Sequence, residues 1–170
     1  MKNISIVFER DKGFVAAAIR AVTKYDSNHV AIRYDSDDWG TSWVLEATVS
    51  RGAQPFPVRK RVWTHVYLVN SSCDLVPHIQ SSETLIGQRY DFLAILLFGW
   101  MFAIWDYFKL KLFRPHWSLK GQMCSELVAR ILNKKFLMAF ESPQWTSPAE
   151  IALFLDQHPD SFTKVLEEQP

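Results

Sequence analysis

Two runs of β-branched and aromatic residues, separated by a turn-rich loop, constrain this fold more than any other feature. They span residues 28–34 and 42–49, and the loop 35–40 between them contains three aspartates and a glycine. This pattern predicts a β-hairpin. Alternate residues place one apolar set on a single face: Val30, Ile32, Tyr34, Trp43, Leu45 and Ala47. Such a face needs helices to cover it, since its side chains would otherwise lie in water.

The remaining elements follow in an order that predicts the fold class. A strand is expected over residues 4–8, a helix over 13–24 and a third strand over 61–69, with Gly52, Pro55 and Pro57 breaking the chain before it. Helical patterns dominate later, over 124–136 and 151–155, the second opened by a capping box at Ser147 and Glu150. We therefore expect an α+β fold, in which a small antiparallel sheet packs against helices. Residues 1–170 contain no obvious linker and are expected to form one domain.

Composition excludes several classes of function. The net charge is only +1, from 19 basic and 18 acidic residues, so the basic footprint of a nucleic-acid-binding protein is missing. Two cysteines, Cys73 and Cys124, do not form a disulfide scaffold, which favours a reducing compartment. The apolar run at the N-terminus is too short for a secretory signal. These features predict a cytoplasmic or virion-associated protein that binds no nucleic acid.

An aromatic and apolar segment over residues 92–117 is predicted to be helical. Its uncharged part, 92–105, is shorter than the roughly 20 residues that a membrane-spanning helix requires. Residues 105–114 mix aromatic side chains with three cations, as an interfacial membrane helix does. Two interpretations stay open: core packing with solvated lysines, or peripheral membrane contact through 92–114.

Cys124 stands at the first turn of the predicted helix 124–136. The unpaired N–H groups and the positive end of the helix dipole at such a position favour thiolate over thiol. Free cysteines are also common core residues, so the position of Cys124 gains meaning only with a base nearby. A nucleophilic thiol needs a general base and, usually, a third group that orients the base.

The predicted hairpin supplies such a pair. If it closes symmetrically around Asp37 and Asp38, His29 lies directly opposite Glu46, on the face that also carries Ala31. A carboxylate there can accept the imidazole N–H and leave the other ring nitrogen for a thiol. His65, on the third strand, is the alternative for the base or for the orienting residue.

No metal site and no cofactor is predicted. Cys73 and His78 have the spacing of half a zinc site, but no second ligand pair follows. Ser125 lacks the glycines of a serine nucleophile elbow. The backbone N–H of Cys124, with Gln122 as a second donor, is the candidate oxyanion-binding group.

These residues carry a resemblance to a known family. His29 within Asn-His-Val-Ala-Ile, Glu46 within Leu-Glu-Ala, Tyr90 before Asp91, and Cys124 opening Cys-Ser-Glu-Leu-Val together resemble the circularly permuted papain-like hydrolases. The histidine precedes the cysteine in the sequence, and in this order the chain resembles the YiiX-like branch of the NlpC-type superfamily. That branch is related to lecithin retinol acyltransferase. The resemblance implies Cys124 as nucleophile, His29 as general base, Glu46 as orienting residue and Tyr90 near the substrate.

The expected function is therefore amide hydrolysis by a cysteine peptidase or amidase. A covalent acyl-enzyme would form on Cys124, from a peptide or isopeptide such as a cell-wall peptide of a bacterium or phage host. One alternative is a lipid amidase, esterase or acyltransferase that works at a membrane. Another is a non-catalytic interaction protein, associated with a virion or with secretion, that keeps the fold and binds a virion or effector partner.

Overall fold

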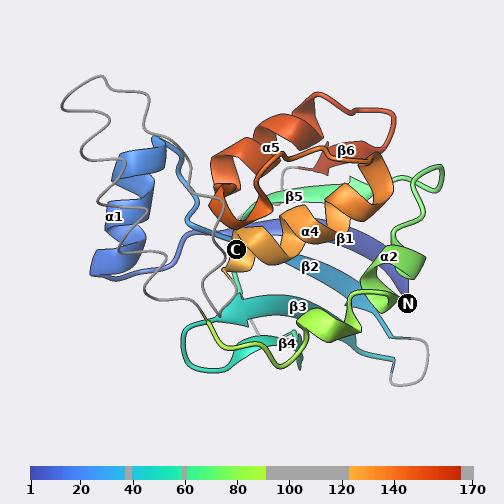
Figure 1. Cartoon of the computed structure of the whole chain (residues 1–170), viewed down its shortest axis with the longest axis horizontal. Coiled ribbons are helices and arrows are strands. Elements are labelled where there is room, and N and C mark those ends of the chain that lie inside the picture. Colours follow the sequence, from blue (N-terminus) through green and yellow to red (C-terminus); the bar gives the residue numbers. More distant parts are fainter. Residues whose placement is uncertain (37–39, 59–60, 91–122, 166–170) are drawn as a thin grey trace.

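One antiparallel sheet of six strands organises the molecule (Figure 1). The computed structural model describes residues 1–36, 40–58, 61–90 and 123–165. The strand order is β4-β3-β2-β1-β5-β6, and every neighbouring pair is antiparallel. The bounds are β1 Lys2–Glu9, β2 His29–Asp35, β3 Ser42–Thr48, β4 Gly52–Pro57, β5 Trp63–Val69 and β6 Phe162–Val165.

The helices occupy one face and one end of this sheet. Figure 1 shows α4 and α5 lying across the face of the sheet, whereas α1 lies at its end. The bounds are α1 Phe14–Thr23, α2 Val76–Gln80, α4 Cys124–Phe136 and α5 Pro148–Asp156, with 3-10 turns η1 Glu83–Leu85 and η2 Pro143–Trp145. The predicted helix 124–136 is confirmed, as is the capping box, in which Ser147 accepts a hydrogen bond from the Glu150 N–H.

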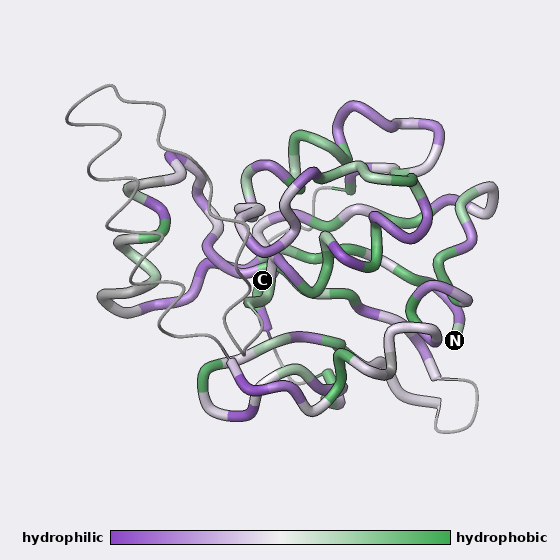
Figure 2. The backbone as a smooth tube through the Cα atoms, in the orientation of Figure 1, coloured by the Kyte–Doolittle hydropathy of each residue, from purple (hydrophilic) through white to green (hydrophobic). Residues whose placement is uncertain are grey.

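The main core lies between α4 and the sheet. The inward residues of α4 recur at helical spacing and are fully buried: Leu127, Val128, Ile131 and Leu132. They belong to the same cluster as the apolar hairpin face, including Val30, Ile32 and Leu45. In Figure 2 hydrophobic and hydrophilic residues alternate along the helices that cover the sheet. The prediction that helices cover this hairpin face is confirmed.

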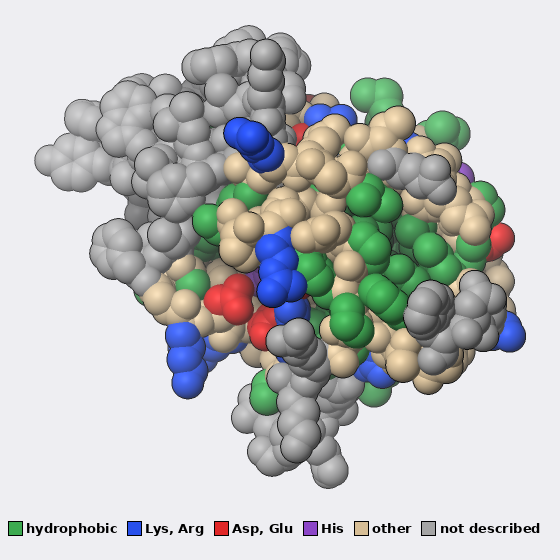
Figure 3. All heavy atoms as spheres, turned by 90° about the horizontal axis from the view of Figure 1, so that it is seen from below, with side chains coloured by type: hydrophobic (Ala, Val, Ile, Leu, Met, Phe, Trp, Pro, Cys, Tyr) green, Lys and Arg blue, Asp and Glu red, His purple; other side chains and the backbone are tan. Residues whose placement is uncertain are grey.

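The opposite face of the sheet has its own small core. Its buried members come from four strands: Val7, Ala31, Val44, Trp63 and Val66. Seen from below the view of Figure 1, acidic and basic side chains adjoin one another beside a hydrophobic area (Figure 3). Alternation along β2 therefore places Ala31 on this face, away from the side that packs against α4.

Two strands were not predicted. Residues 52–57 form β4 rather than a break, because an edge strand tolerates the missing N–H groups of Pro55 and Pro57. The short strand β6 pairs with β5 at the other edge, so strands are not confined to the first half of the chain.

Gly52 is required where β4 begins. Its φ of +71° is left-handed, and a Cβ there would lie 2.2 Å from the carbonyl oxygen of Gln88. The same segment is tied to β4, since the Ala53 N–H donates to that oxygen at 3.0 Å. Backbone must therefore move to admit any side chain at Gly52.

We expect Gly52→Ala to lower the free energy of unfolding by about 2 kcal/mol or more. Gly40→Ala is the matched control, because Gly40 also has a left-handed φ, +57°, but has open space where a Cβ would lie. That substitution should cost only about 1 kcal/mol. Urea denaturation of both variants measures the difference, and equal costs would contradict the role given to Gln88.

Candidate active site

Cys124 is the first residue of α4, and hydrogen bonds to the Glu126 carboxylate hold the start of this helix. Met123 precedes it in an extended conformation, and its backbone N–H donates to the Glu126 carboxylate at 3.4 Å. Arg130, one turn further along, donates from Nε to the same carboxylate at 2.9 Å. These contacts hold the first turn of α4, and so the thiol, in one position.

The Cys124 thiol is buried but surrounded by hydrogen-bond donors. Its side chain contacts the His29 ring and accepts hydrogen bonds from the backbone N–H groups of Val30 and Ser125. Burial by itself would raise the pKa of Cys124, but the charge of His29 and these hydrogen bonds together lower it. The arrangement therefore favours a thiolate.

His29 opens β2 and connects the thiol to Glu46. Its Nε2 lies 2.9 Å from Glu46 Oε2, which leaves Nδ1 as the ring nitrogen for Cys124. Burial by itself would lower the pKa of His29, but the thiolate of Cys124 and hydrogen bonds to Cys124 and Glu46 raise it well above its ordinary value. The two shifts favour a buried pair of thiolate and imidazolium, with Glu46 behind the ring.

The register of the hairpin differs from the predicted one by two residues. Ile32 pairs with Leu45 and Arg33 with Val44, so the next step of the ladder would place Glu46 opposite Ala31, not opposite His29. Direct opposition of His29 and Glu46 was therefore wrong. A shift of two residues keeps both on the same face, however, and long side chains reach a diagonal neighbour.

Arg61, which sequence reasoning missed, holds the far side of Glu46. Its two terminal nitrogens donate to Glu46 Oε2 at 2.6 Å and to Oε1 at 2.7 Å. Burial would raise the pKa of Glu46, whose side chain is 2% exposed, but hydrogen bonds from His29 and Arg61 lower it to about 2. Glu46 is therefore an anion at any physiological pH. A buried glutamate requires a cation, and this was the signal that could have prompted a search for one.

The other candidate residues lie apart from this chain of contacts or outside the described part of the molecule. His65 Nε2 contacts Asp26 Oδ1 at 3.1 Å, and its ring packs against Phe8 and Tyr25. It is Glu46, not His65, that contacts His29. Tyr90 is half-buried against the main core. Gln122, Asp91 and the segment 92–117 lie outside the described residues.

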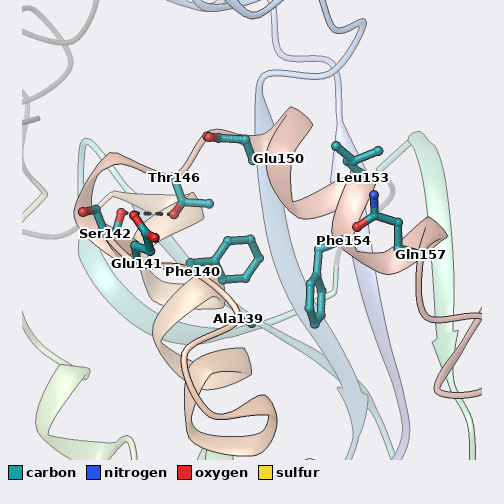
Figure 4. A pocket seen from close by; sticks show the side chains of 9 residues that line it. All are labelled: Ala139, Phe140, Glu141, Ser142, Thr146, Glu150, Leu153, Phe154 and Gln157. Atoms are coloured by element: carbon teal, nitrogen blue, oxygen red, sulfur yellow. Dashed lines mark hydrogen bonds between the residues drawn. The ribbon is translucent and has the colours of Figure 1, made fainter. Parts of the chain in front are cut away.

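A cavity of about 210 Å³ adjoins Glu46 on the side of Arg61. Strands β3 and β4 and the turn between them supply most of its lining, which includes Thr48, Ser50, Arg51 and Phe56. A second cavity, of about 280 Å³, lies between α5 and the turn that follows α4 (Figure 4). Phe140 and Phe154 line it, and none of its residues belongs to the cysteine site.

Over the described ranges, no group of three or more His, Cys, Asp or Glu side chains is placed to hold a metal ion. No helix within those ranges has the length and apolar character needed to cross a membrane.

Comparison with known proteins identifies the fold. No protein-family model and no curated protein sequence matches the chain. The crystal structure of the metalloprotein yiiX from Escherichia coli O157:H7 (DUF1105) is similar with a TM-score of 0.62, over 99% of this chain and 98% of that one. Sequence identity is 15%. The chain therefore has the YiiX-like, permuted papain-like α+β fold that its motifs predicted.

Proposed function

We propose that this protein is a cysteine hydrolase that cleaves an amide bond through an acyl-enzyme on Cys124. The observation that carries the proposal is the buried series of contacts from Cys124 through His29 to Glu46. It provides a nucleophile, a proton carrier and an orienting carboxylate in the order that thiol acyl transfer requires. The permuted papain-like fold supports the proposal, because that fold is the scaffold of papain-like hydrolases.

In the first half of the reaction the Cys124 thiolate attacks the substrate carbonyl carbon. A C–S bond forms and the carbonyl electrons move to oxygen, beside the backbone N–H of Cys124 at the start of α4. As the C–N bond breaks, protonated His29 transfers its proton from Nδ1 to the leaving nitrogen. The amine departs and a thioester remains on Cys124.

In the second half a water molecule replaces the amine. Neutral His29 takes a proton from the water as the oxygen attacks the thioester carbonyl carbon. The C–S bond breaks, the carboxylic acid leaves, and the thiolate and imidazolium are restored. Throughout, Glu46 accepts a hydrogen bond at His29 Nε2, which keeps the ring oriented and Nδ1 directed at Cys124.

The residues around Cys124 do not fit a metal ion, although the similar solved structure is described as a metalloprotein. Cys124 and His29 supply two metal ligands at most. The third candidate ligand, Glu46, contacts the other ring nitrogen of His29, Nε2. Both oxygens of Glu46 are also occupied by Arg61. We therefore derive no step through a metal at this site.

The substrate that we propose is a peptide or isopeptide, because amide cleavage needs the proton that His29 can deliver to a poor leaving group. The lipid alternative depended on membrane contact through 92–114, which lies outside the described residues. The non-catalytic alternative predicts an ordinary thiol at Cys124. Reactivity of the thiol therefore separates enzyme from interaction protein.

We expect the rate at which Cys124 reacts with iodoacetamide to fall less steeply between about pH 8 and about pH 6 than that of an ordinary cysteine. The lowered pKa of Cys124 keeps more of it as thiolate, whereas an ordinary cysteine, with a pKa near 8.5, loses reactivity about tenfold per pH unit. The measurement uses Cys73→Ala, so that Cys124 is the one thiol in the protein.

The control is the reciprocal variant, Cys124→Ala, which leaves Cys73. Cys73 is buried in the main core, and burial raises its pKa. Its labelling should be slow at every pH and fall as pH falls. If Cys124 behaves in the same way, the protein is not a cysteine hydrolase.

A further inference from the structure

We propose that the cavity beside Glu46 binds a carboxylate on the leaving-group half of the substrate. The inference rests on the proposed function for its place in the reaction, whereas binding itself can be measured without catalysis. The residues of its lining that can donate hydrogen bonds are Thr48, Ser50, Arg51 and Arg61.

Arg51 is the main reason to expect an anion. Its guanidinium lies over the Phe56 ring, 5.0 Å from the ring centre, and no carboxylate of the described residues pairs with it. Stacking on an aromatic ring holds the planar guanidinium in place while its N–H groups stay available. A guanidinium that is held in one orientation beside a cavity, and that has no carboxylate partner among the described residues, can bind the carboxylate of a ligand.

Further donors lie beside Arg51. The Thr48 hydroxyl oxygen is buried and has no hydrogen-bond partner among the described residues, which is costly unless a ligand or water supplies one. Arg61 uses N–H groups on Glu46 and, at 3.4 Å, on Glu9, but a guanidinium has five, so some remain. The cavity therefore offers donors that have no acceptor among the described residues.

The charge of the lining is also positive. It contains two guanidinium groups and one carboxylate, that of Glu46, which already accepts hydrogen bonds from Arg61 and His29. Glu9, which Arg61 also contacts, lies outside the lining. An incoming anion would therefore meet Arg51 rather than a bare negative charge. The volume, about 210 Å³, is smaller than the clefts that hold whole ligands and suits one small group of a larger substrate.

The position of the cavity selects the half of the substrate. His29 must reach the leaving nitrogen, so the leaving-group half lies on the His29 side of Cys124. Glu46 touches His29 at 2.9 Å and also lines the cavity, so the cavity lies further along that same side. A substrate with a carboxylate beyond its scissile bond, such as a C-terminal or acidic residue, could place that group near Arg51.

The test is an NMR titration of the full chain with N-acetylglycine and with N-acetylglycinamide, which differ only in the carboxylate. We expect N-acetylglycine to bind at least about tenfold more tightly, and Arg51→Gln to remove that preference. The control is Arg10→Gln, since Arg10 is exposed and lies outside the cavity lining but changes the net charge equally. It should change affinity by less than about twofold.

Equal binding of the two probes, or full affinity in Arg51→Gln, would overturn the proposal. Tighter binding of inorganic phosphate than of N-acetylglycine, with the same dependence on Arg51, would also overturn it, because the cavity would then be a phosphate site. If N-acetylglycine does not bind but Cys124 is alkylated rapidly, the carboxylate site is wrong and the proposed hydrolase is unaffected. If Cys124 is alkylated slowly but N-acetylglycine binds in a way that depends on Arg51, the carboxylate site is supported and the proposed hydrolase is wrong.

Discussion

Replacing His29 with alanine is expected to slow the alkylation of Cys124 at pH 6 by at least about tenfold. Burial raises the pKa of a cysteine, and at Cys124 the imidazolium of His29 is the main charge that outweighs it. Without the ring, the backbone N–H groups of Val30 and Ser125 remain but the ion pair is lost. The thiolate fraction at pH 6 should therefore fall, and the higher intrinsic nucleophilicity of the more basic thiolate recovers part of the rate.

The measurement is the rate of iodoacetamide labelling against pH in the Cys73→Ala background. His65→Ala is the matched control, because His65 is also a strand histidine beside a carboxylate, 3.1 Å from Asp26, but touches neither Cys124 nor Glu46. Its labelling profile should match that of the parent. A His29→Ala profile that also matches the parent would show that α4 alone lowers the pKa of Cys124.

The pH range of the ion pair follows from the two shifts. The thiolate is lost as pH falls through the lowered pKa of Cys124, and the imidazolium is lost as pH rises through the raised pKa of His29. Between those two values both charges are present. We therefore expect amide hydrolysis to follow a bell-shaped pH profile, whose acid limb reports the thiolate and whose alkaline limb reports loss of the proton that His29 donates. A profile that rises steadily up to pH 9 would contradict this assignment.

Alternation in the hairpin predicted the face of the site but not its register. The apolar set of Val30, Ile32 and Leu45 identified which side of the hairpin packs against α4. His29 and Glu46 were predicted together on the alternate positions, and they contact one another. Alternation has a period of two, so it cannot distinguish a register from one shifted by two residues. Turn geometry sets that choice, and the acidic loop 35–40 did not indicate where the turn is centred.

Long-range partners were harder to predict than the elements that carry them. Arg61 lies two residues before β5, and its side chain reaches Glu46 on a strand that is not a neighbour of β5 in the sheet. No local pattern encodes such a contact, because strand order decides it. Cys124 was different, since the start of α4 depends on residues close by, Met123 and Glu126, and could be predicted from the sequence.

Removing the Arg61 side chain is expected to destabilise the protein by about 3 kcal/mol or more at pH 7. Glu46 would stay buried without the two hydrogen bonds from Arg61, and breaking a buried ion pair from one side commonly costs this much. Arg61→Ala and the double variant Arg61→Ala with Glu46→Gln can be compared by urea denaturation. The double variant should recover part of the loss, since a neutral amide costs less to bury than an unpaired carboxylate.

Acid denaturation gives a second, independent readout of the same contact. The folded-state pKa of Glu46, about 2, lies below its ordinary value of 4.5, so its contribution to stability is complete above about pH 4.5 and is lost as pH falls toward 2. Without Arg61 the pKa of Glu46 rises, and the acid unfolding midpoint of Arg61→Ala should move to higher pH. The double variant has no carboxylate at this position and should lose that dependence on pH. If both variants unfold at the same pH as the parent protein, Arg61 is not what keeps Glu46 charged, and His29 alone must orient that carboxylate.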